Sequence, residues 1–135
     1  MATILVGTDT STAADLAVET AADLALARGA DLVVVYVRPQ EAAREVFDAD
    51  KAADPAEYLA ELAGRFPGLT VRTRQEEGDP AERICRVAGD EAAEVIVVGN
   101  RGVHGRLLSY LRSVPHDVLR RANSSVLVVD TRSRQ

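Results

Sequence analysis

The stretch Leu32–Val37 reads LVVVYV, with no alternation of apolar and polar residues. A strand that meets water on one face usually alternates, whereas a strand covered on both faces is apolar throughout. The same character recurs in Ile4–Val6, Val95–Val98 and Val126–Val129. The four runs therefore predict a parallel sheet with helices packed on both of its faces.

A fifth run, Thr70–Arg74, has a different pattern. Val71 and Thr73 alternate with Arg72 and Arg74. Such alternation indicates a strand with one solvent-exposed face, which is typical of a sheet edge. We therefore predict a five-stranded, mostly parallel sheet in which this run is an edge strand.

Helical patterns separate the predicted strands. In Ser11–Arg28 the acidic residues Asp15, Glu19 and Asp23 recur every four positions opposite an apolar stripe, and Gly29 ends the helix. Shorter amphipathic helices are predicted over Pro55–Phe66, over Ala81–Ala88 behind an Asp79 cap, and from Val114 to Ala122. The order βαβαβαβαβ predicts an α/β fold, a single doubly wound domain over residues 1–135.

The stretch Gln40–Asp54 is the least regular part of the chain and is rich in Ala, Asp and Glu. Two interpretations stay open for it, a mobile loop and a marginal helix. We assign it no chemistry.

Composition excludes several classes of protein. The formal net charge is −5 at pH 7 without a basic cluster, so we expect no nucleic-acid partner. Cys85 is the only cysteine, which rules out an intramolecular disulfide, and its apolar helical surroundings predict a packed thiol. The start MATILVGTDT is unlike a signal peptide, and no run of about 18 apolar residues occurs. We therefore expect a cytoplasmic protein without a membrane partner.

Candidate binding residues follow from the topology, because ligands of doubly wound sheets bind at the carboxyl ends of the strands. The first strand leads into Gly7, Thr8 and Asp9, and the Asp9 carboxylate can accept hydrogen bonds from a sugar hydroxyl or an adenine amino group. Capping of the next helix is the alternative role of Asp9. The fourth strand runs into Gly99–Gly105, where glycines let backbone N–H groups approach an anion.

Ser113 and Val114 stand at the start of the last predicted helix, where free N–H groups and a hydroxyl can bind an anion. Helix capping is the alternative role of Ser113. Neither the phosphate loop ending in Gly-Lys-Ser/Thr nor a G-x-G-x-x-G fingerprint after the first strand is present. His104 and His116 lack a second ligand or a base partner, so no metal site and no catalytic residue is predicted.

The spacing of Gly99, Gly102 and the pair Arg112-Ser113 carries a resemblance. The universal stress protein family has a glycine, two residues, a glycine, nine residues, then a glycine followed by serine or threonine, and this chain is similar at all but one of those positions. The strand sequences ILVGTD at 4–9 and VIVVG at 95–99 also resemble the family. The resemblance covers nearly the whole chain and implies a fold like that of the adenine nucleotide alpha hydrolases.

The resemblance also implies a binding site for ATP or another adenine nucleotide, with Mg²⁺ as a companion ion. Its residues would surround adenine and ribose with Gly7, Thr8, Asp9 and Val37, and the phosphates with Gly99, Gly102, Ser113 and Val114. Arg112 stands where ATP-binding members carry glycine, so its side chain either narrows the phosphate path or pairs with a phosphate. Pro115 stands where many members offer a hydroxyl, and proline also removes an N–H.

Two functions follow from these residues. The leading interpretation is a regulatory module that binds an adenine nucleotide and passes the bound state to an unidentified protein partner. The alternative, suggested by Arg112 and Pro115, is a nucleotide-independent homodimeric interaction protein. The resemblance implies a homodimer through Val126–Val129 in either case. An enzyme has the least support, with at most slow ATP hydrolysis, because no base, magnesium carboxylate pair or phosphate-loop lysine is apparent.

Overall fold

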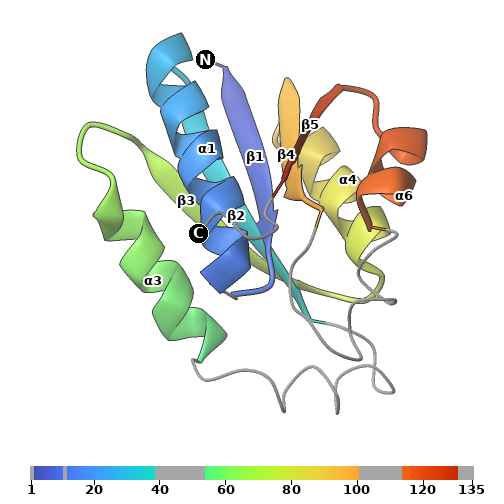
Figure 1. Cartoon of the computed structure of the whole chain (residues 1–135), viewed down its shortest axis with the longest axis horizontal. Helices are drawn as coiled ribbons and strands as arrows, with labels where there is room; N and C mark the ends of the chain where they lie inside the picture. The colour runs from blue at the N-terminus through green and yellow to red at the C-terminus, as the bar shows by residue number, and fades with distance from the viewer. Residues whose placement is uncertain (1, 11, 39–53, 101–113, 131–135) are drawn as a thin grey trace.

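The computed structural model describes residues 2–10, 12–38, 54–100 and 114–130 (Figure 1). Strands and helices alternate along these ranges. Of the irregular stretch 40–54, only Asp54 is described, so the choice between a loop and a marginal helix lies outside the described residues.

The described strands form one sheet, and every pairing in it is parallel. They are β1 (Thr3–Thr8), β2 (Asp31–Arg38), β3 (Val71–Glu77), β4 (Val95–Gly99) and β5 (Ser125–Val129). Their order is β3-β2-β1-β4-β5. The chain winds outward from β1 in one direction and from β4 in the other, so the winding reverses between these two strands. The predicted parallel α/β sheet is confirmed, and β3 lies at an edge as expected.

Four described helices cover the sheet. They are α1 (Thr12–Arg28), α3 (Pro55–Arg65), α4 (Pro80–Asp90) and α6 (Val114–Arg121). Figure 1 shows α1 and α3 on one face and α4 and α6 on the other. The doubly wound arrangement predicted from the sequence is therefore present.

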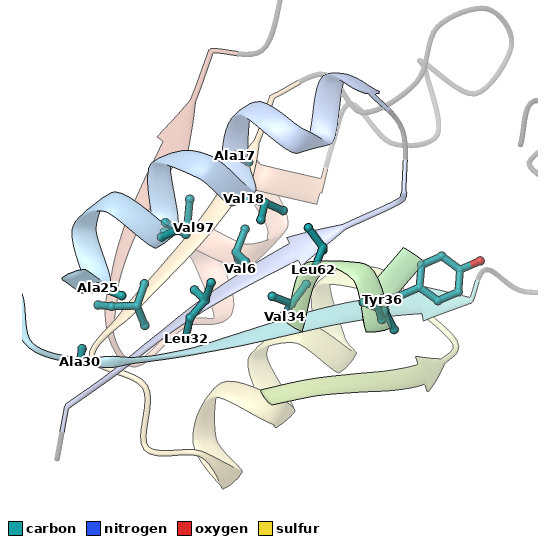
Figure 2. Close-up of a cluster of buried hydrophobic side chains, with 14 residues drawn as sticks. Val6, Ala17, Val18, Ala25, Ala30, Leu32, Val34, Tyr36, Leu62 and Val97 are labelled. Carbon is teal, nitrogen blue, oxygen red and sulfur yellow. The ribbon is translucent and has the colours of Figure 1, made fainter. Parts of the chain in front are cut away.

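The core on the α1 side depends on small helical residues (Figure 2). Ala17, Ala21 and Ala25 of α1 are fully buried, and their short side chains let the helix lie close to the strands. Val6 and Leu32 point toward this helix from the sheet. The β-branched strand residues and the alanine stripe of the helix therefore fill one layer together.

The core on the α4 side contains a close contact at Gly7. A Cβ atom at this position would lie 2.8 Å from Cδ1 of Ile84, which is buried on α4. Real Cβ atoms do not approach a carbon so closely, so a side chain at this position would require the end of the Ile84 side chain to shift.

Cys85 was predicted to be a packed thiol, and it is half-buried against the same layer. Its Sγ donates toward the carbonyl oxygen of Val118 at 3.9 Å. Burial raises the pKa of the Cys85 thiol. The side chain is thus a packing residue with partial exposure rather than a fully buried one.

Two helices end in the same backbone motif with different residues. After α1, Ala30 N donates to Ala25 O at 2.8 Å and Gly29 has φ 66°. After α4, Ala93 N donates to Ala88 O at 2.9 Å and Ala92 has φ 53°. This left-handed conformation suits glycine and strains alanine. Helix α4 continues through Gly89 to Asp90, beyond the predicted end at Ala88, and Ala92 takes the left-handed position after it.

The α4 start agrees with the sequence prediction. Asp79 precedes Pro80, and its Oδ2 accepts a hydrogen bond from Glu82 N at 3.0 Å. Asp54 caps α3 in the same way, with Oδ1 accepting from Ala56 N at 3.0 Å. Each cap satisfies an N–H group that the first turn of a helix leaves without a helical acceptor.

The polar face of β3 is occupied by ion pairs with α4. We call this set the β3–α4 ion chain; it consists of Asp31, Arg72, Glu91, Arg74, Glu76 and Arg83. Arg72 bridges Asp31 at 2.8 Å and Glu91 at 2.9 Å. The face expected to be open to solvent is therefore flanked by α4, and its arginines are fixed by carboxylates.

Candidate functional site

The described candidate residues lie together at the carboxyl ends of the strands, at one end of the sheet. Thr8 ends β1, Gly99 ends β4, and Val37 is the penultimate residue of β2. Because β1 pairs with β2 on one side and with β4 on the other, the three positions are neighbours in space. Figure 1 shows these strands ending toward the lower side of the view. Asp9 follows Thr8 directly, so it lies at the same end, where the winding reverses.

The phosphate half of the predicted site is described only in part. Gly99 ends β4, and Asn100 N donates to Val129 O at 3.0 Å, which fixes the first residue after the strand. Gly102, Arg112 and Ser113 lie outside the described residues, and their predicted roles stay predictions.

The start of α6 carries the remaining candidate. Val114 is the first residue of the helix and is half-buried, and Pro115 is buried at the next position. Proline fits a first helical turn, but it has no N–H to offer to an anion. Asp117 is an acidic residue in the same turn, which further lowers the attraction of this helix end for an anion.

Gly7 and Val37 lie on the same face of the sheet, the one that packs against α4. The missing side chain of Gly7 faces Ile84 of α4, and Val37 belongs to the same buried layer with 6% exposure. The structure therefore gives Gly7 a packing role at the end of β1. A ligand contact through its backbone stays a prediction.

Thr8 has a hydrogen-bonding role that the sequence did not indicate. Its Oγ1 accepts a hydrogen bond from Thr10 N at 3.0 Å and donates one to the hydroxyl of Tyr58 at 3.4 Å. The residue is 9% exposed, and its hydroxyl contacts Tyr58 on the α3 side of the sheet. Thr8 therefore connects the end of β1 to helix α3.

The turn after β1 has an unusual backbone. Thr10 has φ 70°, a left-handed conformation that a β-branched residue rarely adopts. Such conformations cost on the order of 1 to 3 kcal/mol and persist where neighbouring contacts hold them. Asp9 is half-buried immediately before it, with its Oδ2 atom inside the protein. The strained residue and the candidate carboxylate are thus adjacent.

Tyr58 and Asp15 complete this arrangement, and neither was predicted from the sequence to lie at the site. The Tyr58 hydroxyl of α3 donates a hydrogen bond to Asp15 Oδ1 of α1. Burial raises the pKa of Tyr58, and the hydrogen bond to Asp15 raises it further. The tyrosine is therefore a protonated donor at neutral pH.

The acidic residues that recur opposite the apolar stripe of α1 differ in exposure. Glu19 and Asp23 are exposed, whereas Asp15 is half-buried against Tyr58. The position of Tyr58 could have indicated this contact. Tyr58 lies four positions before Leu62, so its hydroxyl is carried on the apolar side of α3, which packs against the rest of the protein.

The two histidines have different standing: His116 is exposed on α6, and His104 lies outside the described residues. No three His, Cys, Asp or Glu side chains within residues 2–10, 12–38, 54–100 and 114–130 are grouped so that they could hold a metal ion. None of the helices described is both long enough and apolar enough to cross a membrane.

Residues 1–130 match the family model described as the universal stress protein family. The chain belongs to this family. It is 34% identical over 143 residues to universal stress protein Rv1636 of Mycobacterium tuberculosis strain H37Rv, and the match covers 96% of each chain. Universal stress protein MT1672 of Mycobacterium tuberculosis strain CDC 1551 matches at the same identity and coverage. The resemblance inferred from the glycine spacing and the strand sequences is confirmed.

Solved structures of universal stress proteins superpose on this chain. A universal stress protein in complex with cAMP is 28% identical with a TM-score of 0.73, and the match covers 96% of this chain and 97% of that one. UspA from Lactobacillus plantarum is 26% identical with a TM-score of 0.72, covering 95% and 97%. Hypothetical protein MJ0577 is 22% identical with a TM-score of 0.78, covering 98% and 97%, and supports the fold alone. The five-stranded parallel universal stress protein fold is therefore established for this chain.

Proposed function

We propose that this member of the universal stress protein family binds ATP or another adenine nucleotide at the carboxyl ends of β1, β2 and β4. The observation that carries the proposal is the convergence of Thr8, Asp9, Val37 and Gly99 at the end of the sheet where the winding reverses. That is where doubly wound sheets bind ligands. A relative of 28% identity was solved with cAMP, which supports the adenine nucleotide class.

Each residue has a role that fits its chemistry. Val37 offers an apolar surface to the adenine ring, and the Asp9 carboxylate accepts hydrogen bonds from the ribose hydroxyls or the adenine amino group. Backbone N–H groups at Gly99, Gly102 and the Ser113–Val114 pair bind the phosphates. Arg112 adds a guanidinium, which pairs well with phosphate oxygens. Mg²⁺ would neutralise phosphate charge when ATP is bound.

The test is isothermal titration calorimetry with freshly purified protein against ATP, AMP and cAMP, each with and without Mg²⁺. We expect binding, and we expect Asp9→Asn to weaken it about tenfold or more because a charge-assisted hydrogen bond is lost. Asp23→Asn is the matched control, because Asp23 is exposed toward the far end of α1 and should leave affinity unchanged. No binding at millimolar nucleotide contradicts the proposal.

A second candidate is a nucleotide-independent interaction protein. The specific observation behind it is the burial of Pro115 at the second position of α6, where it removes an N–H from the proposed phosphate side. Arg112 in place of the family glycine points the same way. If this candidate holds, the wild-type chain binds no nucleotide, and the double substitution Arg112→Gly with Pro115→Ser creates binding. Absence of binding in both proteins would mean that these two positions are not the reason.

In either case we propose a homodimer through Val126–Val129 of β5. Among the described strands β5 pairs only with β4, and Leu127 and Val128 are each 38% exposed. An apolar strand at a sheet edge favours pairing with a second chain, and a second copy offers the same surface. Sedimentation velocity at micromolar concentration tests this, and a monomer there contradicts it. The cytoplasmic location and at most slow ATP hydrolysis stay predictions from the sequence.

A further inference from the structure

Four residues form a directed chain of hydrogen bonds beside the proposed site. Thr10 N donates to Thr8 Oγ1 at 3.0 Å, Thr8 Oγ1 donates to the Tyr58 hydroxyl at 3.4 Å, and Tyr58 donates to Asp15 Oδ1. Both hydroxyl groups accept one hydrogen bond and donate another. We call these four residues, Thr10, Thr8, Tyr58 and Asp15, the hydrogen-bond relay. It joins β1, α3 and α1 through residues 43 and 50 positions apart in the sequence.

The direction of the relay is fixed by its last acceptor. The Asp15 carboxylate can only accept, so Tyr58 must donate to it and can offer only a lone pair to Thr8. Thr8 therefore donates its hydroxyl proton to the Tyr58 oxygen. A lone pair on Thr8 Oγ1 then accepts the hydrogen bond from the N–H group of Thr10. Hydrogen bonds arranged in this way polarise and strengthen one another in a partly buried site.

The relay ends at the strained part of the backbone. Thr10 has φ 70°, and the N–H that donates to Thr8 belongs to this residue. Asp9 lies between the two threonines, so the direction of its carboxylate depends on the backbone that the relay holds. Thr8 is 9% exposed as a residue, and without the Tyr58 hydroxyl its own hydroxyl would lose its hydrogen-bond acceptor.

We infer that Tyr58 is a positioning residue of the proposed nucleotide site, which holds Asp9–Thr10 in the conformation that presents Asp9 to the ribose or adenine. Its effect on a ligand rests on the proposed function, whereas its effect on the backbone does not. Because coupling between two sites is reciprocal, a bound nucleotide also strengthens the contact of α3 with β1 and α1. Amide exchange in helix α3 should therefore depend on whether a nucleotide occupies the site.

The experiment compares Tyr58→Phe with two matched variants. Thr20→Val also removes a half-buried hydroxyl, which donates to Leu16 O at 2.8 Å within α1 and outside the relay. Asp15→Asn keeps an oxygen acceptor for Tyr58 while it removes the charge. For each protein, calorimetry gives the affinity for ATP and AMP, and NMR gives the hydrogen-exchange rate of the Thr10 amide without nucleotide.

We expect Tyr58→Phe to weaken nucleotide affinity about tenfold and to accelerate exchange of the Thr10 amide about tenfold, since both part-buried hydrogen bonds of the Tyr58 hydroxyl are lost. Thr20→Val should match the wild type in both measurements. Asp15→Asn should stay within about threefold, because an amide oxygen accepts the same bond more weakly. In the wild type, bound nucleotide should slow amide exchange in α3.

The outcomes separate the inference from the proposed function. If the wild type binds nucleotide and Tyr58→Phe changes neither affinity nor Thr10 exchange, the inference is wrong and the proposed function stands. If the wild type binds none, the proposed function fails, and the exchange rate alone decides whether Tyr58 holds the backbone. If Tyr58→Phe does not fold, Asp15→Ala breaks the relay at its other end and is measured in the same way.

Discussion

The two edges of the sheet differ in chemistry. At β3, Arg72 and Arg74 are held by carboxylates of the β3–α4 ion chain. At β5, Leu127 and Val128 are each 38% exposed beside an edge that no described strand covers. Charged side chains at an edge discourage pairing with another chain, whereas an apolar edge favours it. The sheet therefore has one charged edge, which disfavours pairing, and one apolar edge, which carries the proposed homodimer contact.

The β3 edge depends on carboxylates that are largely covered. The side chains of Glu76 and Glu91 are 13% and 19% exposed. Burial alone would raise the pKa of Glu76, but hydrogen bonds from Arg83 and Arg74 lower it below the ordinary value. A hydrogen bond from Arg72 lowers the pKa of Glu91 in spite of burial. The edge is therefore fixed by a network, which resists solvent screening better than an isolated surface pair.

The largest expected effect comes from a charge on the apolar edge. Leu127→Glu should weaken homodimer association about a hundredfold or more, because both copies would bury a carboxylate without a partner. Sedimentation velocity across micromolar concentrations measures it. Thr73→Glu on the exposed surface of β3 is the control and should leave association unchanged. Equal association of both variants would show that β5 is not the dimer contact.

A smaller effect is expected from breaking the charged edge. Glu91→Gln leaves Arg72 and Arg74 without the carboxylate that they share, and should lower the free energy of unfolding by about 1 kcal/mol. Urea unfolding at pH 7 measures it, with Glu19→Gln on the exposed face of α1 as the control. If the variant is as stable as the control, the ion chain contributes nothing measurable.

The same edge should give the protein part of its acid sensitivity. A carboxylate with a lowered folded pKa adds stability above its unfolded pKa, near 4.5 for Glu76 and Glu91, and this stability is lost as pH falls through the folded pKa. Below pH 4.5 the wild type should therefore lose more stability than Glu91→Gln. Urea unfolding in steps from pH 7 to pH 3 tests this. Parallel curves for the two proteins would contradict it.

The smallest effect concerns the helix that flanks the charged edge. Ala92→Gly should raise the free energy of unfolding by about 0.5 to 1 kcal/mol, because glycine adopts φ 53° without the strain of a Cβ atom. Gly29→Ala at the same position after α1, where φ is 66°, should lower it by a similar amount. Thermal unfolding measures both. Changes of equal sign in the two variants would contradict this explanation.

Much of the fold could be predicted from local patterns. The apolar run in β2 and the alternation in β3 gave the parallel sheet and its edge strand, because side-chain periodicity records which faces are covered. The end of α4 was predicted too early, because an alanine at φ 53° cannot be recognised from its sequence neighbours. The polar face of β3 was expected to be solvated, and the positions of Glu91 and Arg83 relative to it follow only from how α4 packs.

The candidate site divides in the same way. The sequence by itself placed Thr8, Asp9, Val37 and Gly99 near the carboxyl ends of predicted parallel strands, which lie at the same end of a sheet. The strand order, with β1 between β2 and β4, then brings these residues together. Only the tertiary structure decided that the Tyr58 hydroxyl hydrogen-bonds to Thr8 and that the Ile84 side chain packs against Gly7. These contacts join segments far apart in the chain, and no local pattern encodes how deeply a helix packs against a sheet. Periodicity specifies which face of an element is buried, and packing specifies which atoms meet there.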